Sequence, residues 1–287
     1  MSLEQLVEIS NYYGIDEEIV LMGGGNTSYK DNDFLYVKAS GTTLKTITAE
    51  GFVKMNRAKL TKVWSKTYSE DFDMREEEVL TDLLAARETT AMRPSVETIL
   101  HDLFPQKFVV HTHPTLVNAL TCAKNGETWA KKLFGNDLLW LPPLMPGYVL
   151  AKEVKDILAN YKENHLKDAN VLFLENHGIF AAADSIDEIK TLMNNILEKI
   201  AGQIDKSGSE NEIKLLLSIG WDKFSEKYGI FTPDHYVYRG NELLFADSVK
   251  IAVYAKKFGG CRAMPGWLTK FIENWEAEKY RTAVSGK

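Results

Sequence analysis

The sequence predicts a globular chain of α/β or α+β class, because segments with helical periodicity alternate with short apolar runs that are typical of strands. Its 287 residues are 45% hydrophobic and 26% charged, which is the composition of an ordinary soluble domain. This length suits one large domain or two small ones. The pattern leaves the order of the strands open.

The N-terminal part of the chain is predicted to alternate helices with a turn and a strand. Apolar residues at helical spacing predict a helix over residues 3–13, which Gly14 is placed to end. A helix is also predicted from Pro94 to Leu103, since proline favours the first turn of a helix. The other predicted elements here are a glycine-rich turn over residues 22–28, a strand over 34–39 and a helix with an acidic start over 75–90.

The alternation continues to about residue 205. Ser185 and Glu188 form a predicted capping box that opens a long amphipathic helix. Residues 206–210 are the best linker candidate, so we expect a catalytic domain over 1–205 and a mainly helical extension over 206–287, which packs on the same domain or on a neighbouring subunit. The other predicted elements are a strand over 108–113, helices over 115–124 and 150–161, a strand leading into His177, a strand-like segment over 236–238 and an aromatic helix over 267–280.

Charge and cysteine content make several classes of protein improbable. The net charge of −6 does not suggest nonspecific binding to nucleic acid. Cys122 and Cys261 have no metal-like spacing, so we expect a reducing cytoplasm and no disulfide framework. The chain starts without a basic, apolar leader, and no apolar run approaches the ~20 residues that span a bilayer, so neither a secretory signal nor a membrane segment is expected.

The most informative residues are two histidines one position apart, His111 and His113, at the end of an apolar run. Side chains at i and i+2 of a strand point the same way, so the two imidazoles can bind one metal ion. A third histidine, His177, follows a similar apolar run. Three histidines that leave a fourth position open are typical of catalytic zinc sites. The alternative interpretation is a set of polar residues at strand ends.

Glu97 is the candidate general acid/base. It lies four residues before His101 in the predicted helix, so both side chains face the same side. This helix leads almost directly into the histidine strand, which favours a position for Glu97 near the metal. When Glu97 is considered alone, a solvated surface pair is the simpler interpretation.

Two polar turns are candidates for a phosphate cradle. The first has three glycines followed by Asn26, Thr27 and Ser28, and the second contains Ser40 and Gly41. Glycines let the backbone approach an anion, and successive N–H groups form a concave nest. The first turn has neither the lysine of a Walker A loop nor the spacing of a dinucleotide-binding turn. A plain tight turn is the alternative.

Five motifs, in this order, resemble the class II aldolase/adducin family. They are residues 24–28 (its first phosphate turn), 39–41 (its second), 94–97 with His101 (its Ser-Ser-Glu helix start), 111–114 (its zinc-binding pair) and 176–178 (its third zinc ligand). Within the family, the chain most resembles the aldolase part of rhamnulose-1-phosphate aldolase/short-chain dehydrogenase proteins, with which it shares the late segment 232–235.

The resemblance implies a three-layer α/β/α domain with a mostly antiparallel central sheet, in a homotetramer. It implies one zinc ion per subunit, held by His111, His113 and His177, with Glu97 transferring a proton. The implied reaction is reversible retro-aldol cleavage of a rhamnulose- or fuculose-like ketose 1-phosphate to dihydroxyacetone phosphate and an aldehyde. The implied phosphate-binding residues are Gly25, Asn26, Thr27, Ser28, Ser40, Gly41 and Ser95.

Two positions depart from the family pattern. Val96 replaces the second serine of the helix start, which removes one phosphate donor. Pro143 stands where the fuculose-phosphate aldolases have a catalytic tyrosine, so that tyrosine is absent or supplied from elsewhere, for example by Tyr148. The substrate range and the need for a phosphate stay open for this reason.

Other functions fit the same scaffold. A sugar-phosphate epimerase or dehydratase would use the same metal site, although the family's epimerases tend to have aspartate where Glu97 stands. A non-catalytic module like the adducin head domain is less compatible, since such domains lose the histidines that this chain keeps. Trp267, Trp275 and Tyr280 of the C-terminal part predict core or subunit packing, or a cover over a neighbouring subunit's site.

Overall fold

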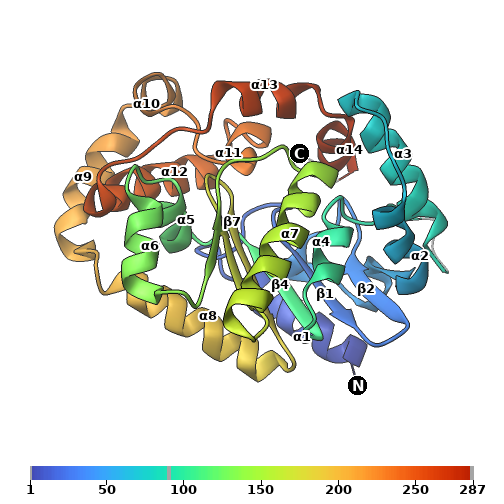
Figure 1. Ribbon diagram of the computed structural model, residues 1–287. Coiled ribbons are helices and arrows are strands. Elements are labelled where there is room, and N and C mark those ends of the chain that lie inside the picture. Colours follow the sequence, from blue (N-terminus) through green and yellow to red (C-terminus); the bar gives the residue numbers. More distant parts are fainter. Residues whose placement is uncertain (1, 89–91, 285–287) are drawn as a thin grey trace.

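A seven-stranded sheet forms the middle layer of the protein in the computed structural model, which describes residues 2–88 and 92–284 (Figure 1). The strands lie in the order β3-β2-β1-β4-β7-β6-β5, and all neighbours are antiparallel except β5 and β6. The strands are β1 (Asn26–Lys30), β2 (Phe34–Lys38), β3 (Phe52–Asn56), β4 (Phe108–Thr112), β5 (Leu139–Leu141), β6 (Val171–Leu174) and β7 (Gly178–Ala183).

Alternation along the central strand β4 divides the core between the two faces of the sheet. Val110 packs in a cluster on one face, and Val109 packs in a second cluster on the other. His111 continues on the face of Val109, where its ring stacks on Phe180 with the centroids 4.1 Å apart. Strand β1 runs beside β4 and pairs Asn26 with His111. The register therefore brings these two polar residues together.

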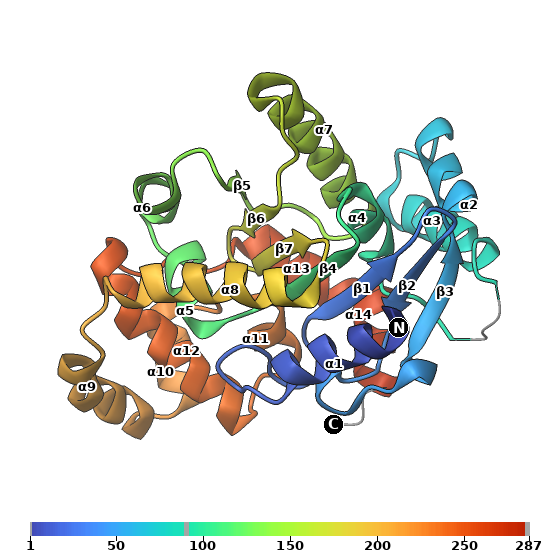
Figure 2. The same ribbon diagram turned by 90° about the horizontal axis from the view of Figure 1, so that it is seen from below.

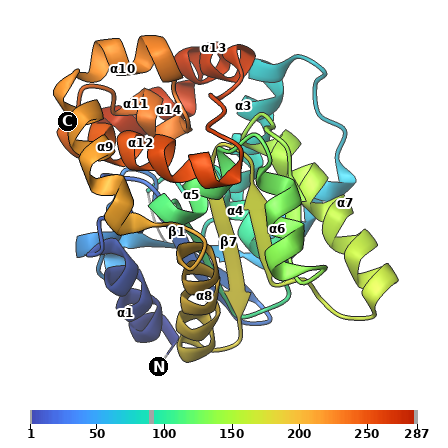
Figure 3. The same cartoon turned by 90° about the vertical axis from the view of Figure 1, so that its left-hand side faces the viewer.

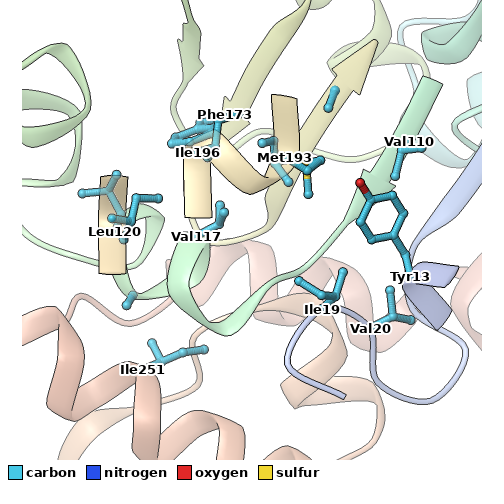
Figure 4. Packing of buried hydrophobic residues seen from close by; sticks show 14 of the residues in the cluster. Tyr13, Ile19, Val20, Val110, Val117, Leu120, Phe173, Met193, Ile196 and Ile251 are labelled. Atoms are coloured by element: carbon cyan, nitrogen blue, oxygen red, sulfur yellow. The ribbon is translucent and has the colours of Figure 1, made fainter. Parts of the chain in front are cut away.

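The cluster around Val110 is covered by helices α1 (Ser2–Gly14), α5 (Thr115–Thr121), α6 (Gly126–Phe134) and α8 (Ile186–Ala201). Figure 4 shows part of this packing, with Met193 and Ile196 of α8 near Phe173 of β6. The capping box predicted at the start of α8 is confirmed, because Ser185 accepts from the backbone of Glu188 and the Glu188 carboxylate accepts from the backbone of Ser185.

The opposite face carries α2 (Arg57–Thr61), α3 (Phe72–Ala85), α4 (Thr98–Leu103) and α7 (Tyr148–His165). Figure 2 shows α1 and α8 on one side of the sheet and α4 and α7 on the other. The three-layer, mostly antiparallel architecture implied by the resemblance is thus confirmed. Short 3₁₀ helices complete the connections: Leu44–Thr46, Ala49–Gly51, Lys62–Ser65 and Ala255–Phe258.

The C-terminal helices gather at one end of the sheet, as Figure 3 shows. They are α9 (Lys206–Ser218), α10 (Trp221–Tyr228), α11 (Pro233–Val237), α12 (Glu242–Tyr254), α13 (Gly266–Asn274) and α14 (Glu276–Val284). Leu216, Phe224 and Val249 are buried in the same cluster as residues of α1 and α8. Among the described helices, none is both long and apolar enough to cross a membrane.

Several predicted elements are wrong in their extent or type. The proposed linker at 206–210 is the start of α9, where Asp205 accepts from the backbone N–H of Gly208. The strand-like segment 236–238 belongs mostly to α11, which begins at Pro233 after a Thr232 cap. The aromatic helix near the C-terminus is two helices that meet at Trp275.

The helices before β4 also differ from the prediction. The helix expected from Pro94 begins only at Thr98, because Pro94 pairs with Ala39 in an isolated bridge and the N–H of Ser95 donates to the Lys38 carbonyl. The helix predicted over 75–90 spans Phe72–Ala85, and residues 89–90 of that prediction lie outside the described part of the chain.

Candidate active site

The three histidines predicted as metal ligands lie together. His111 is on β4, His113 follows the end of that strand, and His177 lies in the turn between β6 and β7. The Nε2 atoms of His111 and His113 are 3.0 Å apart, and one ligand atom from each of the three rings lies within 4.8 Å of the others. Nitrogens bound to one tetrahedral zinc ion lie roughly 3.3–3.4 Å apart for Zn–N distances near 2.0–2.1 Å. The cluster is therefore of the right size for one ion.

The turn that carries His177 is held by Asn176. This residue adopts a left-handed conformation with φ 57°, which asparagine tolerates better than most residues. Its buried amide donates to the carbonyl groups of Phe231 and Arg262, each at 3.0 Å. Gly178 follows, and a Cβ there would lie 2.7 Å from the ring of His113. Both neighbours of His177 thus have a structural reason for their identity.

The hydrogen bonds of the first two histidines leave their Nε2 atoms suited to a cation. Nδ1 of His111 donates to the Ile179 carbonyl at 2.9 Å, and Nδ1 of His113 donates to Oδ2 of Asp234 at 2.6 Å. In the neutral rings, both protons are then on Nδ1, so two Nε2 lone pairs face each other. Two acceptors at this distance need a cation or a proton between them. The donor set therefore fits a divalent metal such as zinc.

Electrostatics favour the neutral form of the third histidine. Burial, and then the nearby charges of His111 and His113, lower the pKa of His177 to about 3. A neutral imidazole is the form that binds metal ions. At neutral pH, His177 is ready to act as a ligand.

Glu97 faces this cluster from the start of α4. Its Oε1 lies 3.5 Å from Nε2 of His111 and 3.9 Å from Nε2 of His177, and the residue is 6% exposed. Its Oε2 accepts a hydrogen bond of 2.6 Å from the Asn26 amide. One carboxylate oxygen is therefore held, and the other is directed at the histidines. Glu97 precedes the first helical residue, so it is not inside the helix with His101 as predicted.

His101 fixes the orientation of the Asn26 amide. Its Nε2 contacts Oδ1 of Asn26, which can only accept, so the proton is on Nε2. Its Nδ1 then accepts from the Ser28 hydroxyl at 2.7 Å. Burial, followed by the charges of His111 and Lys30, holds the pKa of His101 well below its ordinary value, so the ring is neutral. This chain of bonds turns the amide NH₂ group of Asn26 toward Glu97.

The side chains of Thr27 and Ser28, expected in the first phosphate turn, do not line the cleft. Both residues are fully buried in β1, and alternation sends them to opposite faces of the sheet. Ser28 is bonded to His101, while the Thr27 hydroxyl is 2.6 Å from that of Ser10 on α1. Both hydroxyls are thus engaged inside the protein. Gly25 and Asn26, by contrast, line the cleft beside the histidines.

The cleft has an empty volume of about 680 Å³, including its open mouth. Its polar end contains Ser40, Gly41 and Ser95, which were predicted to bind phosphate, together with Lys38. The Ser95 N–H donates to the Lys38 carbonyl and the Ser40 N–H donates to that of Arg93, so the two segments are joined. Lys38 is 4% exposed and was missed. Its position at the end of β2, two residues before Ser40, was the signal that could have identified it.

The opposite wall comes from the C-terminal helices. It consists of Pro233, Asp234, Ile272, Trp275 and Ala277. The segment 232–235 was predicted only as part of the family resemblance, and Trp275 only for packing or for covering a neighbouring subunit's site. Asp234 lies 121 positions from His113, and such a contact leaves no periodic signal in the sequence.

The departures from the family pattern concern Tyr148, Val96 and Pro143. Tyr148 stacks on Trp64 and packs edge-on against Tyr68, and it does not line this cleft. Within the described residues, no tyrosine does. Val96 lines the cleft beside Glu97, and Pro143 lines a smaller neighbouring pocket next to His177.

Comparisons with known proteins agree with this geometry. Residues 4–203 match the model of the family described as the class II aldolase and adducin N-terminal domain. A curated relative from Bacillus subtilis (strain 168), named "Uncharacterized oxidoreductase YuxG", is 29% identical over a 222-residue alignment that covers 74% of this chain. The chain spans only 31% of that relative's length.

Solved structures are similar as well. The N-terminal class II aldolase domain of a conserved protein from Thermoplasma acidophilum is 28% identical, with a TM-score of 0.60 over 70% of this chain and 93% of that one. An aldolase II superfamily protein from Pseudomonas syringae matches 99% of this chain and 91% of its own at a TM-score of 0.50 and 13% identity, a likeness of fold alone.

Proposed function

Because this chain belongs to the class II aldolase and adducin family, we propose that it is a metal-dependent lyase acting on a ketose 1-phosphate. The proposed reaction is the reversible retro-aldol cleavage of a rhamnulose- or fuculose-phosphate-like substrate to dihydroxyacetone phosphate and an aldehyde. The observation that carries the proposal is the Glu97 carboxylate, with one oxygen held by Asn26 and the other directed at three clustered histidines.

His111, His113 and His177 would hold one zinc ion per subunit through neutral imidazole nitrogens. When bound, the ion would supply Lewis-acid stabilisation of the negative charge that cleavage leaves on the dihydroxyacetone phosphate half. The Nδ1 atom of His111 is bonded to a backbone carbonyl and that of His113 to a carboxylate, which keeps both rings in the orientation needed for this role.

Glu97 would move the proton. In cleavage, Oε1 would deliver a proton to the carbon atom that loses its bond partner, and water in the open cleft would take the proton of the hydroxyl that becomes the aldehyde carbonyl. In synthesis both proton transfers would run in reverse. The hydrogen bond from Asn26 to Oε2 keeps Oε1 on the side of the histidines. The carboxylate is nearly buried, which shields the exchanged proton from bulk water.

The polar end of the cleft would bind the phosphate. The Lys38 side chain, the hydroxyls of Ser40 and Ser95, and the backbone at Gly41, whose φ is 86°, line one region of the cleft. A cation and hydroxyl donors are the groups that phosphate recognition uses. Phosphate binding here would orient the reacting carbon relative to Glu97.

An epimerase or dehydratase acting on a sugar phosphate is the second candidate. It is favoured by the absence of a tyrosine among the described residues of the cleft and by Val96 in place of a second serine. The same metal and the same carboxylate would serve either reaction. Analysis of products separates the candidates, since they give two carbonyl fragments, an isomer, or loss of water.

The proposal is tested by incubating purified, zinc-loaded protein with ketose 1-phosphates and with the unphosphorylated sugars, and by measuring release of dihydroxyacetone phosphate. Cleavage of at least one phosphorylated ketose is expected. Failure to cleave any ketose, with no isomer or dehydrated product formed, would contradict an enzymatic role and favour a binding module. We also propose that the protein is cytoplasmic and that it forms a homotetramer. Analytical sedimentation would measure the oligomeric state.

Glu97→Gln is expected to keep the metal and the fold while kcat falls roughly 10²–10⁴-fold, because the amide cannot transfer the proton. Turnover, zinc content and thermal unfolding are measured on the same preparation. Glu77→Gln, at an exposed position on α3, is the matched control and should leave turnover unchanged. Wild-type turnover in Glu97→Gln would remove Glu97 from the mechanism.

A further inference from the structure

Asp234 reaches the histidine cluster from the C-terminal helices. It lies on α11, is 4% exposed, and its Oδ2 is 2.6 Å from Nδ1 of His113. The other nitrogen of the same ring faces His111. The ring of His113 therefore lies between the Asp234 carboxylate and the space that the histidines surround.

Gly24 makes this approach possible. A Cβ at position 24 would lie 2.3 Å from Oδ2 of Asp234 and 2.9 Å from the Leu21 carbonyl. Any side chain there would displace the carboxylate. The middle glycine of the run 23–25 therefore has a packing reason that is separate from any contact with a phosphate.

Helix α11 is anchored on several sides. Thr232 caps it and contacts Nδ1 of His235 at 2.8 Å, and Nε2 of His235 is 3.0 Å from Asp247 on α12. Asp247 in turn accepts from Thr115, the first residue of α5, at 2.5 Å. Because His235 is buried and bonded at both nitrogens, the neighbouring Asp234 has little freedom to leave His113.

We propose that Asp234 is a positioning residue of the metal site. It accepts the Nδ1 proton of His113, which fixes the tautomer with Nε2 available to the metal and increases the basicity of that nitrogen. Metal-bound histidines usually have such a partner for their second nitrogen. A segment beyond the family-matched residues 4–203 thus completes the site. This inference rests on the proposed metal-dependent function.

The proposal is tested by the zinc affinity of the metal-free full-length protein, measured by competition with a chromophoric chelator. Asp234→Ala is expected to weaken zinc binding about 10–100-fold, and Asp234→Asn, which keeps an acceptor without the charge, should weaken it less. Gly24→Ala displaces the carboxylate without changing it and should also weaken binding. The cobalt(II) absorption spectrum gives an independent measure of ligand geometry.

Controls separate the possible outcomes. His113→Ala should lose most of the affinity, and Asp222→Asn, an exposed acid on α10, should keep all of it. Circular dichroism verifies the fold of each variant, and if Asp234→Ala does not fold, Gly24→Ala and Asp234→Asn decide the question. If the folded Asp234 and Gly24 variants bind zinc with wild-type affinity, Asp234 is not a positioning residue, and the proposed function is unaffected. Failure of the wild-type protein to bind zinc or cobalt would overturn both the inference and the proposed function.

Discussion

At the scale of single residues, the site depends on hydrogen bonds that fix orientation. Asn26 has an amide whose two ends are distinguished only by their partners, His101 on one side and Glu97 on the other. Because His101 must donate from Nε2, the amide has one orientation, and Oε2 of Glu97 receives a donor. The direction of the Glu97 carboxylate is therefore determined by a neutral histidine that does not touch the cleft.

Ser28→Ala tests this arrangement. Loss of the hydroxyl leaves Nδ1 of the buried His101 without a donor, which should cost roughly 1–3 kcal/mol in the free energy of unfolding. Looser support of Asn26 and Glu97 should also lower kcat, by up to roughly 100-fold, with zinc content unchanged. Urea unfolding and steady-state kinetics measure the two effects.

The adjacent hydroxyl provides the control. Thr27→Val removes a buried hydroxyl on the opposite face of the same strand, where it contacts Ser10 of α1. Its kcat should equal that of the wild type. Equal losses of activity in both variants would mean that the strand as a whole, rather than the bond to His101, matters for turnover.

At the scale of elements, Glu76 joins α3 to the start of α7. Its two carboxylate oxygens lie 3.3 and 3.4 Å from the N–H of Tyr148, and a Cβ at Gly147 would lie 2.3 Å from Oε2. Burial raises the pKa of Glu76 to about 7, although the Tyr148 N–H and Arg75 oppose the shift. The carboxyl is therefore largely protonated below neutral pH, whereas it is ionised in the unfolded chain.

This shift predicts a pH dependence of stability. The unfolded chain releases the Glu76 proton near pH 4.5 and the folded protein only near pH 7, so the contribution of this group is complete below pH 4.5 and is lost as the pH rises to 7. The slope is at most about 1.4 kcal/mol per pH unit. Glu76→Gln should remove this part of the pH dependence in denaturant unfolding. An unchanged slope between pH 4.5 and 7 would contradict it.

At the scale of the whole molecule, the C-terminal helices belong to the core. Leu216, Phe224 and Val249 share a cluster with the helices that cover one face of the sheet, and Thr115 of α5 is bonded to Asp247 of α12. Each large apolar side chain contributes roughly 1.5–3 kcal/mol when fully buried. Removing several such side chains from the core would cost a free energy comparable to the 5–15 kcal/mol by which a typical domain is stable.

A chain ending at residue 205 is therefore expected not to fold cooperatively. Circular dichroism during heating should give a broad, low transition in place of a sharp one, and a dye that binds exposed apolar surface should bind strongly. The full-length protein is the reference. A truncated chain with a sharp transition at the wild-type temperature would make residues 1–205 an independent domain.

Local patterns predicted much of this molecule, and long-range contacts account for the rest. The capping box at Ser185 and the pairing of the His111 and His113 imidazoles follow from spacing alone. The start of β1 was predicted as a turn because glycine and asparagine favour turns, yet pairing with β2 and β4 overrides that preference. Asp234 could not be placed, since nothing local indicates which segments meet across a fold.

The contact between His113 and Asp234 also has a consequence for the order of events during folding. It joins residues 121 positions apart, and contacts between distant segments form late because the chain must first close the loop between them. Zinc added to a refolding chain would therefore bind tightly only after the C-terminal helices have docked. The rate at which the protein acquires its metal then reports the completion of the native structure.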